Sequence, residues 1–173
     1  MGVARHIVAI ALVSVVSACA TPSIRTAGDT TALNVMSVSV DTSQMMVEGR
    51  TLKVTHTQLK SDMEAAVLSA VAPESDANGT PVDVAIAVSK MRLASPLARV
   101  VADTSSLTGT VRVTEVGTGR EVVPATEVTG NTKNIRGAGV IGLATTVSVE
   151  KDYRGTLAGF ANTVRKALFG SEQ

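Results

Sequence analysis

The stretch "PVDVAIAVSKMRL", residues 81–93, has the most regular alternation of apolar and polar side chains in the chain. Its first apolar residues would share one side of an extended strand, and they are Val82, Val84, Ile86 and Val88. The phase then changes, because the next apolar residues are Met91 and Leu93. A bulge near Ser89–Lys90 would return these two side chains to the buried side. The stretch therefore predicts a long, bent strand with one buried face.

The segment before this strand, residues 55–73, has the periodicity of a helix. Its apolar residues recur at the spacing of one buried helix face, and they are Leu59, Met63, Ala66, Val67, Ala70 and Val71. Thr55 and Gln58 fit a capping box at the start, and Pro73 marks the end. The turn-rich residues 74–80 then connect the helix to the strand.

Residues 33–41 alternate and predict a first strand that ends near Asp41. An uninterrupted alternation would place one set of residues on a single side: Leu33, Val35, Ser37 and Ser39. Residues 41–54 are ambiguous, and we expect a loop or a short strand around Thr51–Val54. The pair Met45–Met46 fits flexible core filler better than an exposed contact.

Residues 106–128 predict two strands joined by a tight turn. One face of the first strand would carry Leu107, Gly109, Val111 and Val113. Gly117 and Gly119 supply the positive-φ positions that a hairpin turn needs. Pro124 indicates that the returning strand lies at a sheet edge or leaves the sheet early. Arg112, Arg120 and Glu121 fit a solvated sheet face better than a recognition patch.

The last periodic segment, residues 150–170, predicts a helix with a narrow apolar stripe: Tyr153, Leu157, Phe160, Val164 and Leu168. Gly155 and Gly159 would allow this helix to pack closely on a sheet. The element order β-α-β-β-β-α predicts an α+β fold, with a mostly antiparallel sheet of four to five strands and two helices on one face. We assign it to a single domain, residues 32–170.

Composition narrows the classes of partner. Apolar residues make up 45% of the 173 residues but aromatic residues only 2%, so binding grooves built on aromatic platforms are not expected. The first 18 residues contain one of the 16 basic residues, Arg5, and none of the 15 acidic residues, so the remainder carries 15 of each. The longest basic run is the pair Arg165–Lys166. Nucleic acid is therefore not an expected partner.

The N-terminus has the layout of a secretory signal. Arg5 and His6 precede ten apolar or small residues, 7–16, and small residues lead to the single cysteine, Cys19. Ten helical residues span about 15 Å, roughly half of a bilayer core, so a mature membrane span is not expected. A plain secretory signal or a signal anchor remains an alternative for this segment.

Val16, Ser17, Ala18 and Cys19 resemble the lipobox of bacterial lipoproteins, although Val16 stands where leucine is commonest. The resemblance implies a signal peptide, residues 1–18, that a dedicated peptidase recognises at Val16, Ser17 and Ala18 and removes. It also implies a diacylglycerol group on the Cys19 sulfur and acylation, with palmitate for example, of the new amino group. Ala20 implies transfer to the periplasmic face of the outer membrane, with the inner membrane as the alternative. Residues 19–31 would form the lipidated cysteine and a flexible tether.

We expect no cofactor, no metal and no catalytic residue. The sequence "GAGVIG", residues 137–142, matches a dinucleotide-binding pattern, but it lacks the preceding buried strand and the following helix that this pattern requires. Removal of the signal peptide would leave His56 as the single histidine. A catalytic thiol or a zinc site needs more partners than that. His56 itself fits a solvated side chain beside a helix cap.

The sequence thus predicts a non-catalytic, lipid-anchored protein that presents a small periplasmic domain to envelope partners of unknown identity. One alternative is a carrier of a small molecule or lipid, with a pocket between sheet and helices and residues 95–106 as a lid. The other is a cell-envelope enzyme, which would need carboxylates such as Asp83, Asp103 or Glu115 to converge in a cleft.

Overall fold

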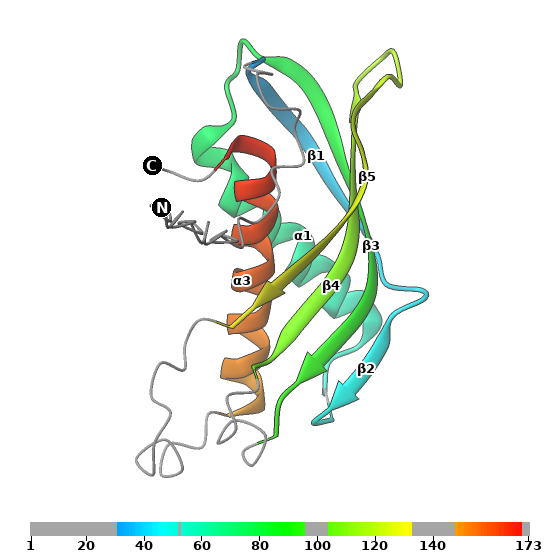
Figure 1. The fold of residues 1–173 in the computed structure, drawn as a ribbon, viewed down its shortest axis with the longest axis vertical. Helices are drawn as coiled ribbons and strands as arrows, with labels where there is room; N and C mark the ends of the chain where they lie inside the picture. Colours follow the sequence, from blue (N-terminus) through cyan, green and yellow to red (C-terminus); the bar gives the residue numbers. More distant parts are fainter. Residues whose placement is uncertain (1–30, 52, 96–103, 133–147, 171–173) are drawn as a thin grey trace, which may run out of the picture.

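A computed structural model describes residues 31–51, 53–95, 104–132 and 148–170. It confirms the predicted α+β class and the order of the major elements (Figure 1). The elements are β1 (Leu33–Asp41), β2 (Met46–Gly49), α1 (His56–Val71), a 3₁₀ turn (Ala72–Glu74), β3 (Thr80–Leu93), β4 (Ser106–Glu115), β5 (Glu121–Asn131) and α3 (Val149–Phe169).

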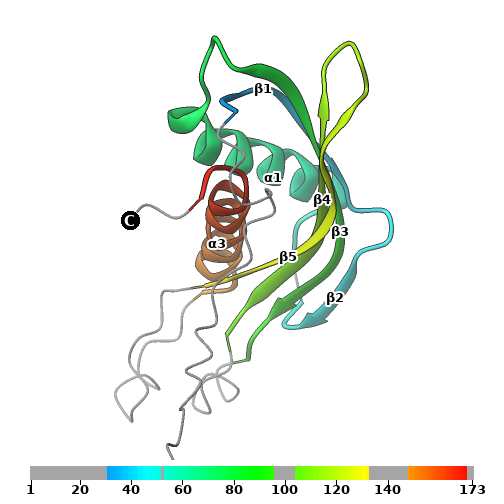
Figure 2. The ribbon, with the colours of Figure 1, turned by 45° about the horizontal axis from the view of Figure 1, so that its top comes forward.

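The strands form one five-stranded sheet around β3. Its order is β1-β3-β4-β5, and β2 pairs with the last residues of β3 along the edge that β1 leaves free. The pairs β3–β4 and β4–β5 are antiparallel, whereas β1 and β2 run parallel to β3. A parallel pair needs a crossover connection, and α1 supplies it. Figure 2 shows α1 and α3 together on one face of the curved sheet.

The predicted bulge in the central strand is confirmed. The pairing of β3 with β4 shifts register between Val88 and Lys90. Met91 and Leu93 are both fully buried as a result, on the same side as the residues that precede the bulge. The bend lets one long strand keep its apolar side chains under both helices.

The predicted uninterrupted alternation of the first strand is wrong after Val35. The β1–β3 register shifts between Val35 and Ser37, and the Met36 side chain remains 58% exposed. After this irregularity, Val40 instead of Ser39 turns to the core. Two serines on the buried side would have cost desolvation without hydrophobic gain, and the bulge exchanges them for valines.

The short strand also lies earlier than expected, at Met46–Gly49 instead of around Thr51–Val54. All four of its residues are exposed, so no burial pattern marks it in the sequence. The methionine pair has two different environments: Met45 packs against the core, whereas the Met46 side chain is 59% exposed. The core-filler prediction therefore holds for the first methionine and is wrong for the second.

The core fills the layer between the helices and the sheet. Helix α1 contributes Leu59, Met63, Val67 and Val71, while the predicted Ala66 and Ala70 are only half-buried. Helix α3 buries its whole predicted stripe, with Phe160 as the largest fully buried side chain. One of the two hydrogen bonds of the predicted capping box is present at the start of α1. Thr55 Oγ1 accepts a 3.1 Å hydrogen bond from the Gln58 backbone N–H.

The hairpin between β4 and β5 confirms the predicted turn. Gly117 and Gly119 have φ values of 85° and 68°, where side chains with a Cβ are strained. β5 is an edge strand, as Pro124 indicated, and the β4–β5 register is irregular next to this proline.

Candidate functional site

A surface groove of about 950 Å³ runs between α1 and the first half of α3. Its walls come from the two helices and from the segment that precedes α1. The groove lies beside the sheet-facing stripe of α1, and Tyr153 and Leu157 belong both to its lining and to the core. The lining residues are Thr51, Lys53, Val54, Gln58, Asp62, Ala65, Ala66, Val149, Glu150, Tyr153, Arg154, Leu157 and Ala158.

One hydrogen-bonded pair joins the two helices inside the groove. The Tyr153 hydroxyl donates a 2.8 Å hydrogen bond to Asp62 Oδ2, and Gln58 Nε2 donates a 2.6 Å hydrogen bond to Asp62 Oδ1. Burial raises the pKa of Tyr153 well above its ordinary value, and the hydrogen bond to Asp62 and the charge of Asp62 raise it further. Tyr153 is therefore protonated at physiological pH and donates its hydroxyl hydrogen to Asp62.

The charged residues at the rim of the groove differ in their partners. Arg154 Nη2 lies 2.6 Å from Glu150 Oε1, so these two charges neutralise each other one helical turn apart. The two carboxylate oxygens of Asp62 accept hydrogen bonds from Gln58 and Tyr153. Lys53 is exposed and forms no ion pair with a carboxylate of the described residues. Among the described lining residues, Lys53 is therefore the charged side chain that has neither an ion-pair nor a hydrogen-bond partner.

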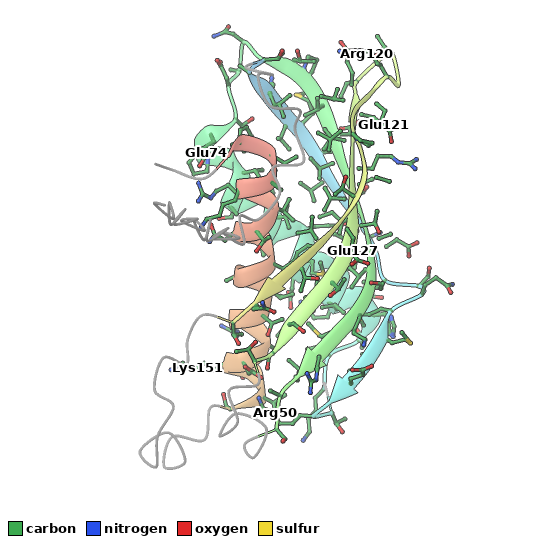
Figure 3. The ribbon with its side chains drawn as sticks, viewed as in Figure 1. Arg50, Glu74, Arg120, Glu121, Glu127 and Lys151 are labelled. Carbon is green, nitrogen blue, oxygen red and sulfur yellow. The ribbon has the colours of Figure 1, made fainter. Side chains whose placement is uncertain are left out.

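A second polar cluster lies at the end of the sheet where β2 and β3 end and β4 begins. Arg50 Nη2 forms an ion pair with Asp152 Oδ2, in the first turn of α3. The same carboxylate oxygen accepts a 2.5 Å hydrogen bond from Ser105 Oγ. Asp152 and Ser105 are 2% and 0% exposed, so this charge is paired and hydrogen-bonded away from water. Figure 3 shows Arg50 and Lys151 at this end of the molecule.

This cluster also holds the backbone of several strands. Ser105 Oγ accepts a 2.9 Å hydrogen bond from the Ala94 N–H, and the Ser105 carbonyl accepts one of 3.0 Å from the Thr132 N–H. The Arg50 N–H donates to the Leu93 carbonyl at 3.0 Å. The cluster thus fastens β2, β3, β4 and β5 to the start of α3.

The predicted lipidation site lies outside the described residues. This applies to Val16, Ser17, Ala18 and Cys19, and to the glycine-rich residues 137–142. Most of the segment proposed as a lid, residues 96–103, also lies outside the described part of the chain. These predictions therefore remain sequence-based.

The carboxylates considered for an enzyme do not meet in the described structure. Asp83 pairs across the sheet with Thr114, and Glu115 pairs with Val82, so the two acidic side chains project from opposite faces. Asp83 accepts a 2.5 Å hydrogen bond from Ser37 Oγ. Asp103 lies outside the described residues. Within the described residues, no three His, Cys, Asp or Glu side chains form a group that could hold a metal ion.

The charged residues of the hairpin form surface ion pairs. Arg112 lies 3.2 Å from Glu121, and Arg120 lies 2.9 Å from Glu115. Hydrogen bonds from Thr118 and Arg120 hold the pKa of Glu115 below its ordinary value. Arg112, Arg120 and Glu121 are exposed, as a solvated sheet face predicts, and Figure 3 shows Arg120 and Glu121 on the hairpin. His56 is exposed beside the helix cap as well.

The sequence pattern did not predict the groove or the buried cluster. Periodicity identifies the buried stripe of each helix, but it does not show how two helices cross or which surface residues line the space between them. A sequence signal for the cluster did exist, because Asp152 falls just before the apolar stripe of α3, next to Tyr153. An acidic residue in a first helical turn, however, is also typical of a solvated helix start.

No protein-family model matches the chain, and no curated protein matches it. Among solved structures, it is similar to a Xanthomonas campestris protein of family DUF330, with 13% identity, a TM-score of 0.44 and coverage of 78% of this chain and 81% of that chain. A "putative lipoprotein" from Caulobacter crescentus has 11% identity and a TM-score of 0.33, with coverage of 71% and 86%. The PelC dodecamer of Paraburkholderia phytofirmans has 13% identity and a TM-score of 0.31, with coverage of 71% and 86%.

No helix within the described residues is sufficiently long and apolar to span a membrane.

Proposed function

We propose that the chain is a lipid-anchored protein of the bacterial envelope whose folded domain is a non-catalytic binding module for envelope partners. The observation that carries this proposal is the sequence Val16-Ser17-Ala18-Cys19 directly after the apolar residues 7–16. Acyl chains on Cys19 would anchor the protein, since each buried methylene contributes about 0.8 kcal/mol. In this proposal, Ala20 after the cysteine favours the outer membrane over the inner membrane.

The distance between anchor and domain supports a display role. The first strand begins at Leu33, so residues 20–31 separate the lipidated cysteine from the fold. Twelve residues reach about 40 Å when fully extended. A domain held in this way can meet partners in the periplasm without contacting the membrane itself.

The side-chain geometry supports a role without catalysis. The buried cluster of Arg50, Asp152 and Ser105 is engaged in holding strand ends, and Tyr153 is held neutral inside the helix pair. Catalysis by general acid and base needs titratable groups that face a substrate with pKa values near the working pH. The contacts of these side chains within the fold support the proposal of a non-catalytic domain.

Labelling with a palmitate analogue tests the anchor. We expect label on the wild type and none on Cys19→Ala, which would stay unprocessed. Ser17→Gly keeps a small residue and is the matched control that should retain the label. Equal labelling of wild type and Cys19→Ala would refute the anchor. Membrane fractionation of Ala20→Asp tests the location, because we expect this variant to move to the inner membrane.

Affinity purification of the acylated protein from intact envelopes, read by mass spectrometry, tests the display role. We expect a defined envelope protein to co-purify with the wild type and to be depleted with Cys19→Ala. Hydrolysis of cell-wall material by the purified domain would instead support the enzyme alternative.

A groove in the structure favours the carrier alternative, but this groove does not lie between sheet and helices, where a pocket was expected. The layer between sheet and helices is occupied by buried side chains such as Met63, Val84 and Phe160. The groove of about 950 Å³ lies between α1 and α3 instead.

A further inference from the structure

The α1–α3 groove, as defined by its lining residues above, exposes more apolar than polar surface, which suits an apolar ligand group. Its α3 wall extends from Val149 to Ala158, about 13 Å at a rise of 1.5 Å per residue. Its volume of about 950 Å³ falls within the range of about 300–1,000 Å³ that is typical of small-molecule sites. The lining residues that come last in each helix have small side chains, and they are Ala65, Ala66 and Ala158.

The electrostatics of the groove are asymmetric. Glu150 is paired with Arg154, whereas Asp62 keeps its negative charge and accepts hydrogen bonds from the neutral side chains of Gln58 and Tyr153. Lys53 lies at the opposite end from the alanines, in the segment that leads into α1. The first turn of α1 contains no acidic residue that would offset this lysine. A ligand with an anionic end would therefore find its counter-charge at Lys53.

We propose that this groove binds an amphiphile with one anionic head group and one unbranched apolar chain. The head group lies beside Lys53, and the chain extends along Val54, Leu157 and Ala158. Burial of each methylene contributes about 0.8 kcal/mol, so a chain of moderate length supplies most of the affinity. This inference goes beyond the proposed function, which does not depend on it.

The same contacts favour an acyl chain over a peptide. A peptide segment would bring backbone N–H and C=O groups into the groove, and each buried group needs a hydrogen-bond partner. Most of the polar lining side chains already have partners, since Gln58 and Tyr153 donate to Asp62 and Arg154 pairs with Glu150, which leaves Thr51 and Lys53 at one end of the groove. An acyl chain makes no such demand.

Calorimetric titration tests the proposal with residues 19–173, which contain every described element, carrying Cys19→Ser to prevent acylation. The probes are decanoate, its uncharged counterpart decanol, and 1-decanoyl-lysophosphatidylglycerol. We expect saturable binding of decanoate and of decanol, with a stoichiometry of one. The affinities of decanoate and the lysophospholipid are then compared. The probe that binds more tightly shows whether a free fatty acid or a lipid head group is the better source of the anion.

Three variants locate the site. Ala158→Phe fills the groove from an exposed position and should abolish binding of all three probes, while its thermal melt stays unchanged. Lys53→Gln should weaken decanoate binding about two- to fivefold, the effect of one partly exposed ion pair, and leave decanol binding unchanged. Lys60→Gln, on α1 outside the groove, is the matched control and should change neither affinity.

Other outcomes of these titrations would contradict the proposal or one part of it. Absence of saturable binding would overturn the proposal, as would binding that survives Ala158→Phe. An equal effect of Lys53→Gln on decanoate and decanol would overturn the assigned position of the head group. Co-purification of an envelope protein that Ala158→Phe abolishes, without binding of any amphiphile, would make the groove a protein interface; it would leave the proposed display function intact.

Discussion

Gly130 on β5 and Gly159 on α3 are in direct backbone contact. A Cβ atom placed on Gly130 would lie 2.8 Å from the Gly159 carbonyl carbon, and one placed on Gly159 would lie 2.9 Å from the Asn131 carbonyl carbon. Both distances are shorter than side chains tolerate, so the two glycines set how closely the helix approaches the edge strand. This close approach is what Gly159 was expected to permit.

Substitution of Gly159 by alanine should therefore destabilise the domain. In an exposed helix interior, glycine to alanine raises stability by about 1 kcal/mol. Here the new methyl group has to push α3 away from β5, and overpacking of this kind typically lowers the free energy of unfolding by about 1–3 kcal/mol. Urea unfolding measures the difference, with Lys151→Ala on the exposed side of α3 as the control within about 0.5 kcal/mol. A more stable Gly159→Ala variant would show that the contact is loose.

Local periodicity explains which features could be predicted from the sequence. The bulge at Val88–Lys90 was predictable, because without it Met91 and Leu93 would leave the core. The stripe of α3 was predictable for the same reason. The irregularity in β1 is harder to predict, since Met36 and Val40 are apolar alike and only tertiary contact decides which of them faces the core.

The functional features depend on contacts that periodicity does not report. Arg50 and Asp152 are 102 positions apart, and the place of Asp152 beside Tyr153 does not distinguish a buried acid from a solvated helix start. The groove requires the relative position of two helices, which is set by the crossover from β1 to β3 and by the packing of α3 on β5. The lipobox is different, because an enzyme reads it as an extended sequence, and it is therefore visible without a fold.

The buried ion pair offers a second prediction. Arg50→Met would leave the Asp152 carboxylate buried with reduced compensation, and loss of one partner of such a pair typically costs about 3–5 kcal/mol. Arg50→Met combined with Asp152→Leu removes both charges and should cost less than the sum of the single changes. Urea unfolding of the four proteins gives the coupling free energy. Arg154→Met breaks the exposed pair with Glu150 and should cost less than about 1 kcal/mol. Additive losses for Arg50 and Asp152 would mean that the pair contributes no coupling.

The sheet-facing stripe of α1 gives a third prediction. Val67 is 1% exposed, so Val67→Asp would bury an unpaired charge and should unfold the domain or lower its stability by several kcal/mol. Lys60→Gln changes an exposed residue of the same helix and should have an effect below about 0.5 kcal/mol. Thermal melts of both variants compare the two faces directly, and similar losses would contradict the assigned orientation of α1.

The contact between Tyr153 and Asp62 leads to a prediction about pH. In the folded protein, burial first, and then the hydrogen bond to Asp62 and its negative charge, raise the pKa of the Tyr153 hydroxyl. In the unfolded chain this pKa is about 10. The folded state therefore keeps a proton that the unfolded state loses above pH 10. The resulting stabilisation is complete below pH 10 and declines as the pH rises toward the folded-state pKa, by about 1.4 kcal/mol per pH unit.

The chain contains a single tyrosine, which makes this prediction directly measurable. Tyrosinate absorbance of the folded protein should appear only well above pH 10, together with unfolding. Tyr153→Phe loses the hydrogen bond to Asp62 and should be about 1 kcal/mol less stable at neutral pH. Between pH 9 and pH 11 the difference between wild type and Tyr153→Phe in urea unfolding should shrink, because only the wild type carries the raised pKa. Ionisation of Tyr153 near pH 10 in a protein that remains folded would show that the hydroxyl is open to water and that the link between α1 and α3 is weak.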